Sequence, residues 1–171
     1  GHLGTLDPMA TGLLVLVTGR ATRLAQFYVK KDKTYLAEIT TGMISDTYDA
    51  EGDVSPVPGD LPSDAAIAEA LEQFRGRFWQ TPPPVSAKKI AGVPAYKLAR
   101  KQIPVELKPV EVEVTRLELR TIAQGKISAL IQCSSGTYIR SIAHDLGQRL
   151  GCGALLSGLR RITVGEFTLE R

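Results

Sequence analysis

The residues best suited to chemistry lie at the start of the chain, where Asp7 sits in a segment rich in glycine and proline. Glycines allow close backbone approach, and Pro8 restricts φ, so the carboxylate of Asp7 is held on a rigid turn and can be aimed at a ligand. The same Asp-Pro pair is typical of a helix start, with aspartate as N-cap and proline at the first helical position. On spacing alone the helix cap is the favoured interpretation.

Other enzyme templates are missing from the sequence. It contains no GxGxxG, no Walker loop, no GxSxG and no HExxH. Because His2 and His144 are the two histidines, a histidine-based triad is difficult to assemble. A carboxylate, several aromatic residues and arginines remain. Such a set suits covalent or electrostatic catalysis on a substrate that is bound through phosphates and stacked bases.

The elements that must position these residues alternate between strand and helix patterns. Periodicity predicts helices and strands of ordinary length, and the strands recur in pairs without regular βαβ alternation. We therefore expect an α+β fold with a mixed, mainly antiparallel β-sheet flanked by helices. The predicted helices are 21–30, Asp64–Arg75 capped by Ser63, and 139–150; the predicted strands are Leu13–Thr18 (buried), Lys33–Thr41, Val110–Ile122 (with a bulge), Lys126–Cys133 and Gly165–Leu169.

Helical spacing also assigns individual faces. In 139–150 an apolar stripe leaves Arg140, His144 and Arg149 on the solvent side. The three prolines that follow Trp79 predict an extended segment. The acidic stretch Ser45–Pro58 has the composition of a polar loop, and its carboxylates do not follow the EF-hand spacing, so we expect no bound metal.

Composition limits the class of protein. The chain has 171 residues, a net charge of +3 and 43% hydrophobic residues, which is typical of a single globular domain. The longest apolar run, Leu13 to Val17, is too short to span a membrane or to act as a signal peptide. Cys133 and Cys152 are isolated, so we expect neither a disulfide framework nor a zinc site, and we expect a cytoplasmic location.

Five segments, in order, resemble the TruB-type tRNA pseudouridine synthases, and together they cover nearly the whole chain. The first is Gly-His-Leu-Gly-Thr-Leu-Asp-Pro-x-Ala-Thr-Gly at residues 1–12. Lys33-x-Tyr35 and the loop Ser-Asp-Thr-Tyr-Asp-Ala-Glu-Gly at 45–52 follow it. The remaining two are Ser-Gly-Thr-Tyr-Ile-Arg at 135–140 and the stretch from Gly153 to Arg161.

The resemblance implies roles for three residues at the reaction centre. Asp7 corresponds to the catalytic aspartate, which suits the electron-poor C1′ that glycosidic cleavage leaves, by covalent attack or by stabilisation. Tyr35 corresponds to an active-site tyrosine that stacks on the uracil, with its hydroxyl placed for proton transfer at C5. Arg140 corresponds to an arginine that pairs with the aspartate and fixes its rotamer. Without the resemblance, Tyr35 is an ordinary strand aromatic and Arg140 a surface residue.

Further residues are implied to bind the substrate. Tyr138 resembles an aromatic wall of the pocket, and Leu159 an apolar lining residue. His2 matches a histidine that is associated with extruding the target nucleotide, and base flipping costs a few kcal/mol. Asp46 is assigned to hydrogen bonding in the pocket. Basic side chains would contact the RNA backbone without reading its sequence; these are Lys88, Lys89, Lys97, Arg100, Lys101, Arg20 and Arg23.

The function implied by the resemblance is isomerisation of a uridine, uridine-55 in the T loop of tRNA, to pseudouridine without a metal or organic cofactor. We expect residues 1–171 to be one catalytic domain, without the family's N-terminal segment and C-terminal RNA-binding module. We also expect a monomer that binds the T stem-loop and needs no protein partner. Two other functions remain open: a non-catalytic RNA-binding or RNA-folding module, which would not need Asp7, and a glycosylase, which would release uracil.

Overall fold

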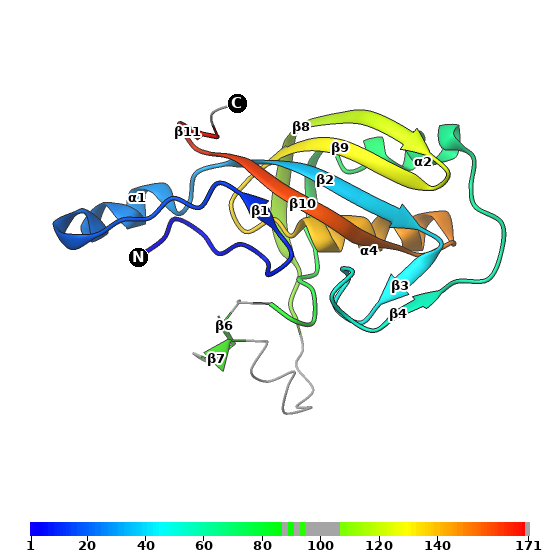
Figure 1. The fold of residues 1–171 in the computed structure, drawn as a ribbon, viewed down its shortest axis with the longest axis horizontal. Coiled ribbons are helices and arrows are strands. Elements are labelled where there is room, and N and C mark those ends of the chain that lie inside the picture. The colour runs from blue at the N-terminus through cyan, green and yellow to red at the C-terminus, as the bar shows by residue number, and fades with distance from the viewer. Residues whose placement is uncertain (87–88, 91–92, 95–106, 170–171) are drawn as a thin grey trace.

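A single β-sheet organises the part of the chain that the structure describes. The structure is a computed structural model, and it describes residues 1–86, 89–90, 93–94 and 107–169. The seven-stranded sheet has the order β1-β10-β2-β9-β8-β5, with β11 paired to β10 (Figure 1). Its strands are β1 (Thr11–Gly12), β2 (Lys33–Thr41), β5 (Gly76–Gln80), β8 (Val110–Ala123), β9 (Lys126–Cys133), β10 (Ala154–Val164) and β11 (Phe167–Thr168). All pairs are antiparallel except the parallel pair β1–β10, which confirms the predicted α+β class.

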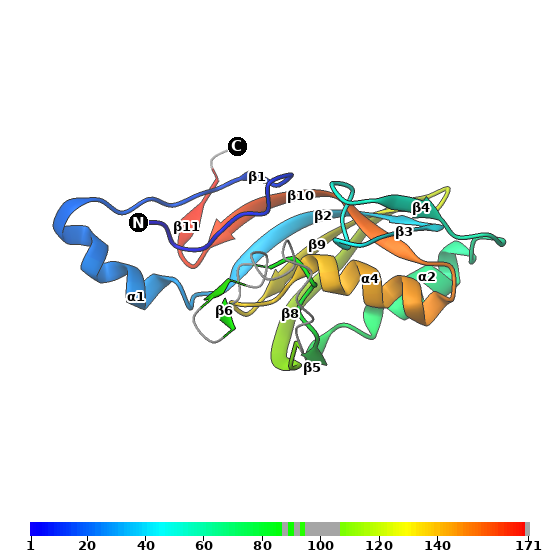
Figure 2. The ribbon, with the colours of Figure 1, turned by 90° about the horizontal axis from the view of Figure 1, so that it is seen from below.

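Two helices cover one face of this sheet and enclose the core. They are α2 (Asp64–Glu72) and α4 (Ile139–Leu150), which lie along the same side of the strands in Figure 2. The side chain of Ser63 accepts a hydrogen bond from the backbone amide of Ala66, so the predicted cap of α2 is confirmed. Ile67 and Leu71 of α2 and the helical stripe of α4 are buried against the sheet.

The central strands alternate as their sequences predict. In β2 the side chains of Tyr35, Ala37 and Ile39 are buried on the helix-covered side. Strand β8 buries Val112 and Val114 and then Leu117, and its register with β9 shifts between Val114 and Arg116. This irregularity confirms the predicted bulge, because one extra residue reverses which side chains face the core.

Of the two elements expected in the first thirty residues, the strand is wrong and the helix is present. Leu13–Thr18 is not a buried strand: it makes isolated backbone hydrogen bonds with the N-terminal residues and with Arg161, and Leu14 and Leu16 are 43% and 66% exposed. The predicted helix at 21–30 is confirmed with shifted bounds: a 3₁₀ helix, η1 (Gly19–Leu24), is followed directly by the α-helical turn α1 (Ala25–Tyr28). These elements extend away from the sheet as an arm (Figures 1 and 2).

Two pairs of short strands and the long strand β10 complete the described part of the fold. The acidic stretch is not only a loop, since β3 (Met43–Ser45) pairs with β4 (Val54–Pro56) around it. The short strands β6 (Lys89–Ile90) and β7 (Val93–Pro94) also pair in an antiparallel manner. Strand β10 does not show strand alternation in the sequence, because its register with β2 shifts at two places. Within the described residues, no helix combines the length and apolar character needed to cross a membrane.

Candidate active site

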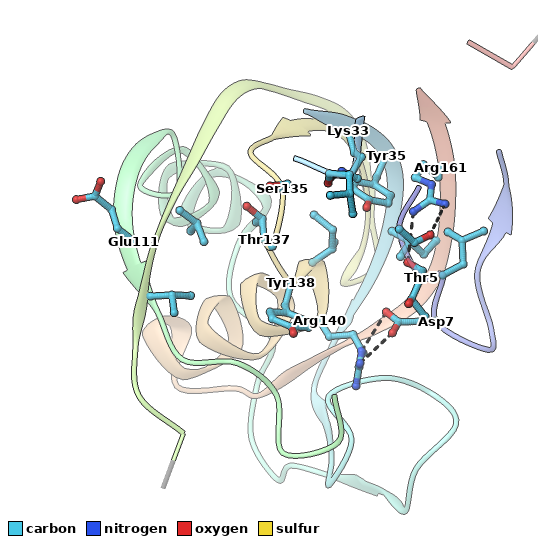
Figure 3. A pocket seen from close by; sticks show the side chains of 18 residues that line it. Thr5, Asp7, Lys33, Tyr35, Glu111, Ser135, Thr137, Tyr138, Arg140 and Arg161 are labelled. Atoms are coloured by element: carbon cyan, nitrogen blue, oxygen red, sulfur yellow. Dashed lines mark hydrogen bonds and ion pairs between the residues drawn. The ribbon is translucent and has the colours of Figure 1, made fainter. Parts of the chain in front are cut away.

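A cavity of about 550 Å³ opens between the N-terminal segment, the starts of β2 and β8, the middle of β10 and the start of α4 (Figure 3). The lining residues come from parts of the chain that are far apart in sequence. The residues that line it are Gly4–Asp7, Val29, Lys33, Tyr35, Val110–Val112, Ser135–Arg140, Leu159 and Arg161. The cavity therefore collects Asp7, Tyr35, Tyr138, Arg140 and Leu159, all of which the sequence predicts as site residues.

Asp7 lies in a turn at one wall of the cavity. The backbone amide of Ala10 donates to the carbonyl of Asp7 at 2.9 Å, and no helix follows, so the helix-cap interpretation is wrong. After this turn the chain enters β1, where Gly12 (φ 95°) packs directly on the backbone of Arg161. A β-carbon at Gly12 would collide with the carbonyl of Arg161, so glycine is required for β1 to dock beside β10.

Arg140 holds the carboxylate of Asp7 through two hydrogen bonds. Its Nε donates to Oδ2 at 3.1 Å, and its second terminal nitrogen donates to Oδ1 at 2.9 Å. The remaining terminal nitrogen donates to the carbonyls of Thr47 and Val85, at 3.0 and 2.9 Å. The Arg140 side chain is 6% exposed and that of Asp7 27%. Such a fork-to-carboxylate pair fixes the aspartate rotamer and leaves the carboxylate accessible from the cavity.

Placing Arg140 on the solvent side of its helix is wrong. The apolar stripe of α4 predicts an exposed arginine, yet the residue is buried. Its charge is balanced by two carboxylates, Asp7 and Asp49, and its donors are taken up by carbonyls. Burial of a cation is tolerated under these conditions, because paired and hydrogen-bonded charges recover the cost of desolvation.

Asp49 is the acidic residue of the β3–β4 loop that reaches the site. Its Oδ2 lies 3.5 Å from Nε of Arg140, and its Oδ1 accepts from Thr47 Oγ1 at 2.6 Å and from the amide of Glu51 at 3.0 Å. Asp46, which the resemblance assigns to the pocket, is exposed and accepts instead from the amide of Asp53 at 2.8 Å. Asp49, three residues further along the same loop, is therefore a site residue that the sequence motif did not reveal.

Tyr35 points into the cavity from β2 and is buried at its base. Burial raises the pKa of Tyr35 to about 12, and a side-chain hydrogen bond with Arg161 opposes part of that rise. The hydroxyl is therefore protonated at neutral pH. Tyr35 offers the cavity a neutral aromatic face with a polar tip.

Two further cations stand beside Tyr35 and were not assigned roles from the sequence. Arg161 is 1% exposed and donates to the carbonyls of Gly4 (3.0 Å), Thr5 (3.3 Å) and Leu13 (2.8 Å). Lys33 donates from Nζ to backbone carbonyls at the end of the arm, and burial, followed by the charge of Arg161, lowers its pKa. The signals were the Lys-x-Tyr pattern and the Arg-Arg pair of β10. Arg161 connects both flanks of the turn that carries Asp7 to Tyr35.

The opposite wall of the cavity is formed by Tyr138 and its support. The side-chain amide of Gln80 accepts from the backbone amide of Tyr138 at 2.8 Å and donates to its carbonyl at 3.0 Å. Burial raises the pKa of Tyr138. Leu159 of β10 adds an apolar surface to the cavity. Gln80 was not predicted, although a buried glutamine that satisfies both backbone groups of a site residue is a strong positional constraint.

The other predicted residues lie outside the cavity. His2 is exposed, and its Nδ1 accepts from the amide of Gly4 at 3.3 Å. Arg20 and Arg23 are exposed on η1. Lys88, Lys97, Arg100 and Lys101 lie outside the described residues, and only the backbone of Lys89, in β6, is described. Among described residues, no group of three or more His, Cys, Asp or Glu side chains is arranged to hold a metal ion.

Curated relatives share about half of this sequence. The tRNA pseudouridine synthase B of Solibacter usitatus is 52% identical over 173 residues, a match that covers 100% of this chain and 59% of the relative. The tRNA pseudouridine synthase B of Aquifex aeolicus is 47% identical, over 99% of this chain and 60% of the relative. The chain thus spans about 60% of the length of these relatives.

Solved structures share the fold. The crystal structure of a Cbf5–Nop10–Gar1 complex contains a chain that matches 99% of this one, with a TM-score of 0.74 and 29% identity, over 41% of its own length. A chain in the structure of an H/ACA RNP bound to a substrate RNA containing 2′-deoxyuridine matches 99% of this one, and 40% of its own length, with a TM-score of 0.70 and 27% identity. Together with the relatives named tRNA pseudouridine synthase B, this likeness assigns the fold to the class of pseudouridine synthases.

Two family models account for the chain within this class. The model described as TruB family pseudouridylate synthase (N terminal domain) matches residues 1–139, and the model described as tRNA pseudouridylate synthase B C-terminal domain matches residues 140–171. The chain belongs to the TruB family of pseudouridylate synthases. The border between the two matches falls inside α4, so both matched segments contribute to one sheet and one cavity.

Proposed function

We propose that this chain isomerises a uridine of tRNA, uridine-55 in the T loop, to pseudouridine. One observation carries the proposal: the carboxylate of Asp7 is held by Arg140 at the wall of a cavity that also contains the Tyr35 ring (Figure 3). Membership of the TruB family, and relatives named tRNA pseudouridine synthase B, support the choice of reaction and substrate.

The reaction moves one glycosidic bond. The bond from C1′ of the ribose to N1 of uracil breaks, and a bond from C1′ to C5 forms. The proton on C5 is lost and N1 gains a proton, so the overall change is an isomerisation. Asp7 faces the electron-poor C1′, as a nucleophile or as a stabilising charge. Arg140 keeps both carboxylate oxygens in place during this step.

The freed uracil must turn within a closed cavity before it rejoins the sugar. Tyr35 supplies a stacking face, and as a neutral phenol it can exchange a hydrogen bond with the base near C5. Tyr138 and Leu159 form the remaining walls. We place His2, which is exposed near the catalytic turn, at the step in which the nucleotide is extruded from its loop. No cofactor takes part in this scheme.

Residues 1–171 act in this proposal as one catalytic domain. The support is topological: β10, from the segment that the second family model matches, lies in the sheet between β1 and β2, from the first. We further propose that the domain works as a monomer on the T stem-loop, in the cytoplasm and without a protein partner. Light scattering of the purified chain, alone and with RNA, measures whether the chain is a monomer and how many chains bind one RNA.

The function is tested by incubating the chain with a synthetic T-arm hairpin. We expect conversion of one uridine at unchanged mass, detected by carbodiimide labelling, and no conversion in a hairpin with cytidine at that position. Release of free uracil would identify a glycosylase instead. Binding without conversion would identify an RNA-binding module.

The basic side chains are tested separately from the site. Charge reversal at Lys88 and Lys89 should weaken RNA binding and reduce its salt dependence. With fewer contacts to phosphates, fewer counterions are released from the RNA when the protein binds. Turnover at saturating RNA should not change. Charge reversal at Arg20 and Arg23, which are exposed on η1, should likewise weaken binding and leave turnover at saturating RNA unchanged. A change in saturated turnover would instead place these residues in the reaction.

A further inference from the structure

Tyr48 and His144 form a stacked ring pair beside the site. Their ring centroids are 3.7 Å apart, and the ring planes differ by 9°. Tyr48 belongs to the β3–β4 loop and His144 to α4, so the pair connects two separate elements. Neither residue lines the cavity. A role for this pair must therefore act through other residues.

Both rings are adjacent to the contacts of Arg140. Tyr48 stands between Thr47, whose carbonyl accepts from Arg140 at 3.0 Å, and Asp49, whose carboxylate lies 3.5 Å from Nε of Arg140. His144 follows Arg140 by four residues in α4, so the two side chains share one face of the helix. The stack therefore joins the loop to the helix one turn from the guanidinium.

The backbone of Tyr48 indicates that its ring is important. Its φ is +66°, in the left-handed region that aromatic residues rarely adopt. The backbone of the β3–β4 loop is bonded to Leu156 of β10. The amide of Leu156 donates to the carbonyl of Tyr48 at 3.0 Å, and the amide of Ala50 donates to the carbonyl of Leu156 at 3.0 Å. An asparagine or glycine would fit this backbone more easily. Tyrosine adds the contact with α4.

We propose that Tyr48 and His144 are positioning residues for the reaction. Their stack holds the Thr47 carbonyl and the Asp49 carboxylate against Arg140, and these two acceptors orient the guanidinium toward Asp7. The inference rests on the proposed function for its catalytic consequence. Its structural part, the orientation of Arg140, stands independently.

The physical reason is the fixed fork of the guanidinium. The donors of Arg140 are shared among Asp7, Asp49 and the carbonyls of Thr47 and Val85. If the loop moves away, the buried guanidinium loses two of these acceptors and must find others by rotating. Rotation would change the hydrogen bonds that align the Asp7 carboxylate. A displacement of about 1 Å at such a group can lower the rate about 100-fold.

Three substitutions at Tyr48 separate the ring from the backbone. Tyr48→Phe keeps the stack. Tyr48→Gly removes the ring and fits the left-handed backbone better, whereas Tyr48→Ala removes the ring and keeps the unfavourable φ. We expect Tyr48→Phe to retain the single-turnover rate at saturating RNA within about twofold, and both ring-deleted variants to lose at least about tenfold, with the RNA Kd unchanged. Wild-type turnover in Tyr48→Gly would overturn the proposal.

Changes at the partner ring provide the matched test. His144→Phe should restore most of the turnover that His144→Ala loses, because a stacked ring is again present. Tyr48→Gly combined with His144→Ala should lose no more than the worse single variant, since both remove the same contact. Additive losses, or losses that appear in KM with kcat unchanged, would contradict a positioning role.

A measurement without turnover distinguishes this inference from the proposed function. The Nε–H of Arg140 gives its own signal in a ¹⁵N-correlated NMR spectrum. We expect this signal at the same position in the wild type and in Tyr48→Phe. In Tyr48→Gly we expect it to shift or broaden, while the other signals remain those of the folded protein. An unchanged signal in Tyr48→Gly would refute the inference. An inactive wild type with the expected signals would refute only the proposed function.

Discussion

Arg140 and Asp7, which are 133 positions apart in the sequence, form a bidentate ion pair. The guanidinium nitrogens lie 3.1 and 2.9 Å from the two carboxylate oxygens. The arginine comes from the first turn of α4 and the aspartate from the turn before β1. Their pairing brings the N-terminal segment onto the helix layer and fixes one wall of the cavity. The same contact thus serves the fold and the proposed chemistry.

Removal of the charge on Asp7 should stop turnover while RNA binding continues. We expect Asp7→Asn to lower kcat by about 1,000-fold or more, because an amide can neither attack C1′ nor balance its charge. RNA affinity should stay within about tenfold, since phosphate contacts dominate it. Tritium release from C5-labelled tRNA and a filter-binding assay measure the two quantities. An Asn variant with most of its activity would show that Asp7 is not the catalytic carboxylate.

Replacement of Arg140 should affect both stability and rate. Arg140→Met leaves the buried carboxylate of Asp49 without its cation, and we expect a loss of about 3 kcal/mol in the free energy of unfolding. Arg140→Lys retains the charge but not the fork, so we expect a smaller loss of stability with kcat still strongly reduced. Urea unfolding and single-turnover kinetics check these values. Full activity in Arg140→Lys would mean that charge alone is sufficient.

Tyr35 should make the folded state sensitive to alkali. Its pKa is about 12 in the folded protein, against 10.0 for the unperturbed group. A raised folded pKa gives stability that is complete below pH 10 and is lost as the pH rises toward 12, because the unfolded chain ionises first. At pH 11 the loss from this group should be about 1 kcal/mol. The urea midpoint of Tyr35→Phe should therefore fall less between pH 9 and 11 than that of the wild type; equal slopes would contradict the burial of the hydroxyl.

His144 should titrate at a lower pH than an exposed imidazole. Burial lowers its pKa below 6.5, and the neighbouring carboxylate of Asp145 opposes part of this shift. A lowered folded pKa means that stability falls as the pH decreases through 6.5, since the unfolded chain takes up the proton first. The histidine resonances, followed by NMR between pH 4 and 8 and assigned with a His2→Ala variant, measure this directly. A His144 midpoint above 6.5 would be the contrary result.

Much of the local structure could be predicted because it depends on neighbouring residues. The alternation of β2, the bulge in β8 and the cap of α2 by Ser63 all appear in the sequence as short-range patterns. β10 could not be recognised in this way, because two register shifts and adjacent arginines interrupt its alternation. Its place beside β2 depends on pairing with distant strands.

The choice between two acids of one loop shows the same limit. Asp46 and Asp49 have similar sequence surroundings, and the resemblance pointed to Asp46. The positive φ of Tyr48 reverses the chain between them, so Asp49 turns inward to Arg140 while Asp46 bonds to the exposed turn. Backbone reversal at a non-glycine residue leaves little signal in composition or spacing.

The sequence by itself determined the order of the motifs and most of the regular elements. It also identified Asp7, Tyr35 and Arg140 as site residues. The tertiary structure decided which charges are buried. Helical periodicity places Arg140 in solvent, whereas its ion pairs with Asp7 and Asp49 keep it inside. Arg161 is likewise held inside by carbonyls of the segment that precedes Asp7. Periodicity measures only which face of an element is apolar, and the partners that allow a charge to be buried are supplied by chain segments more than 50 residues away.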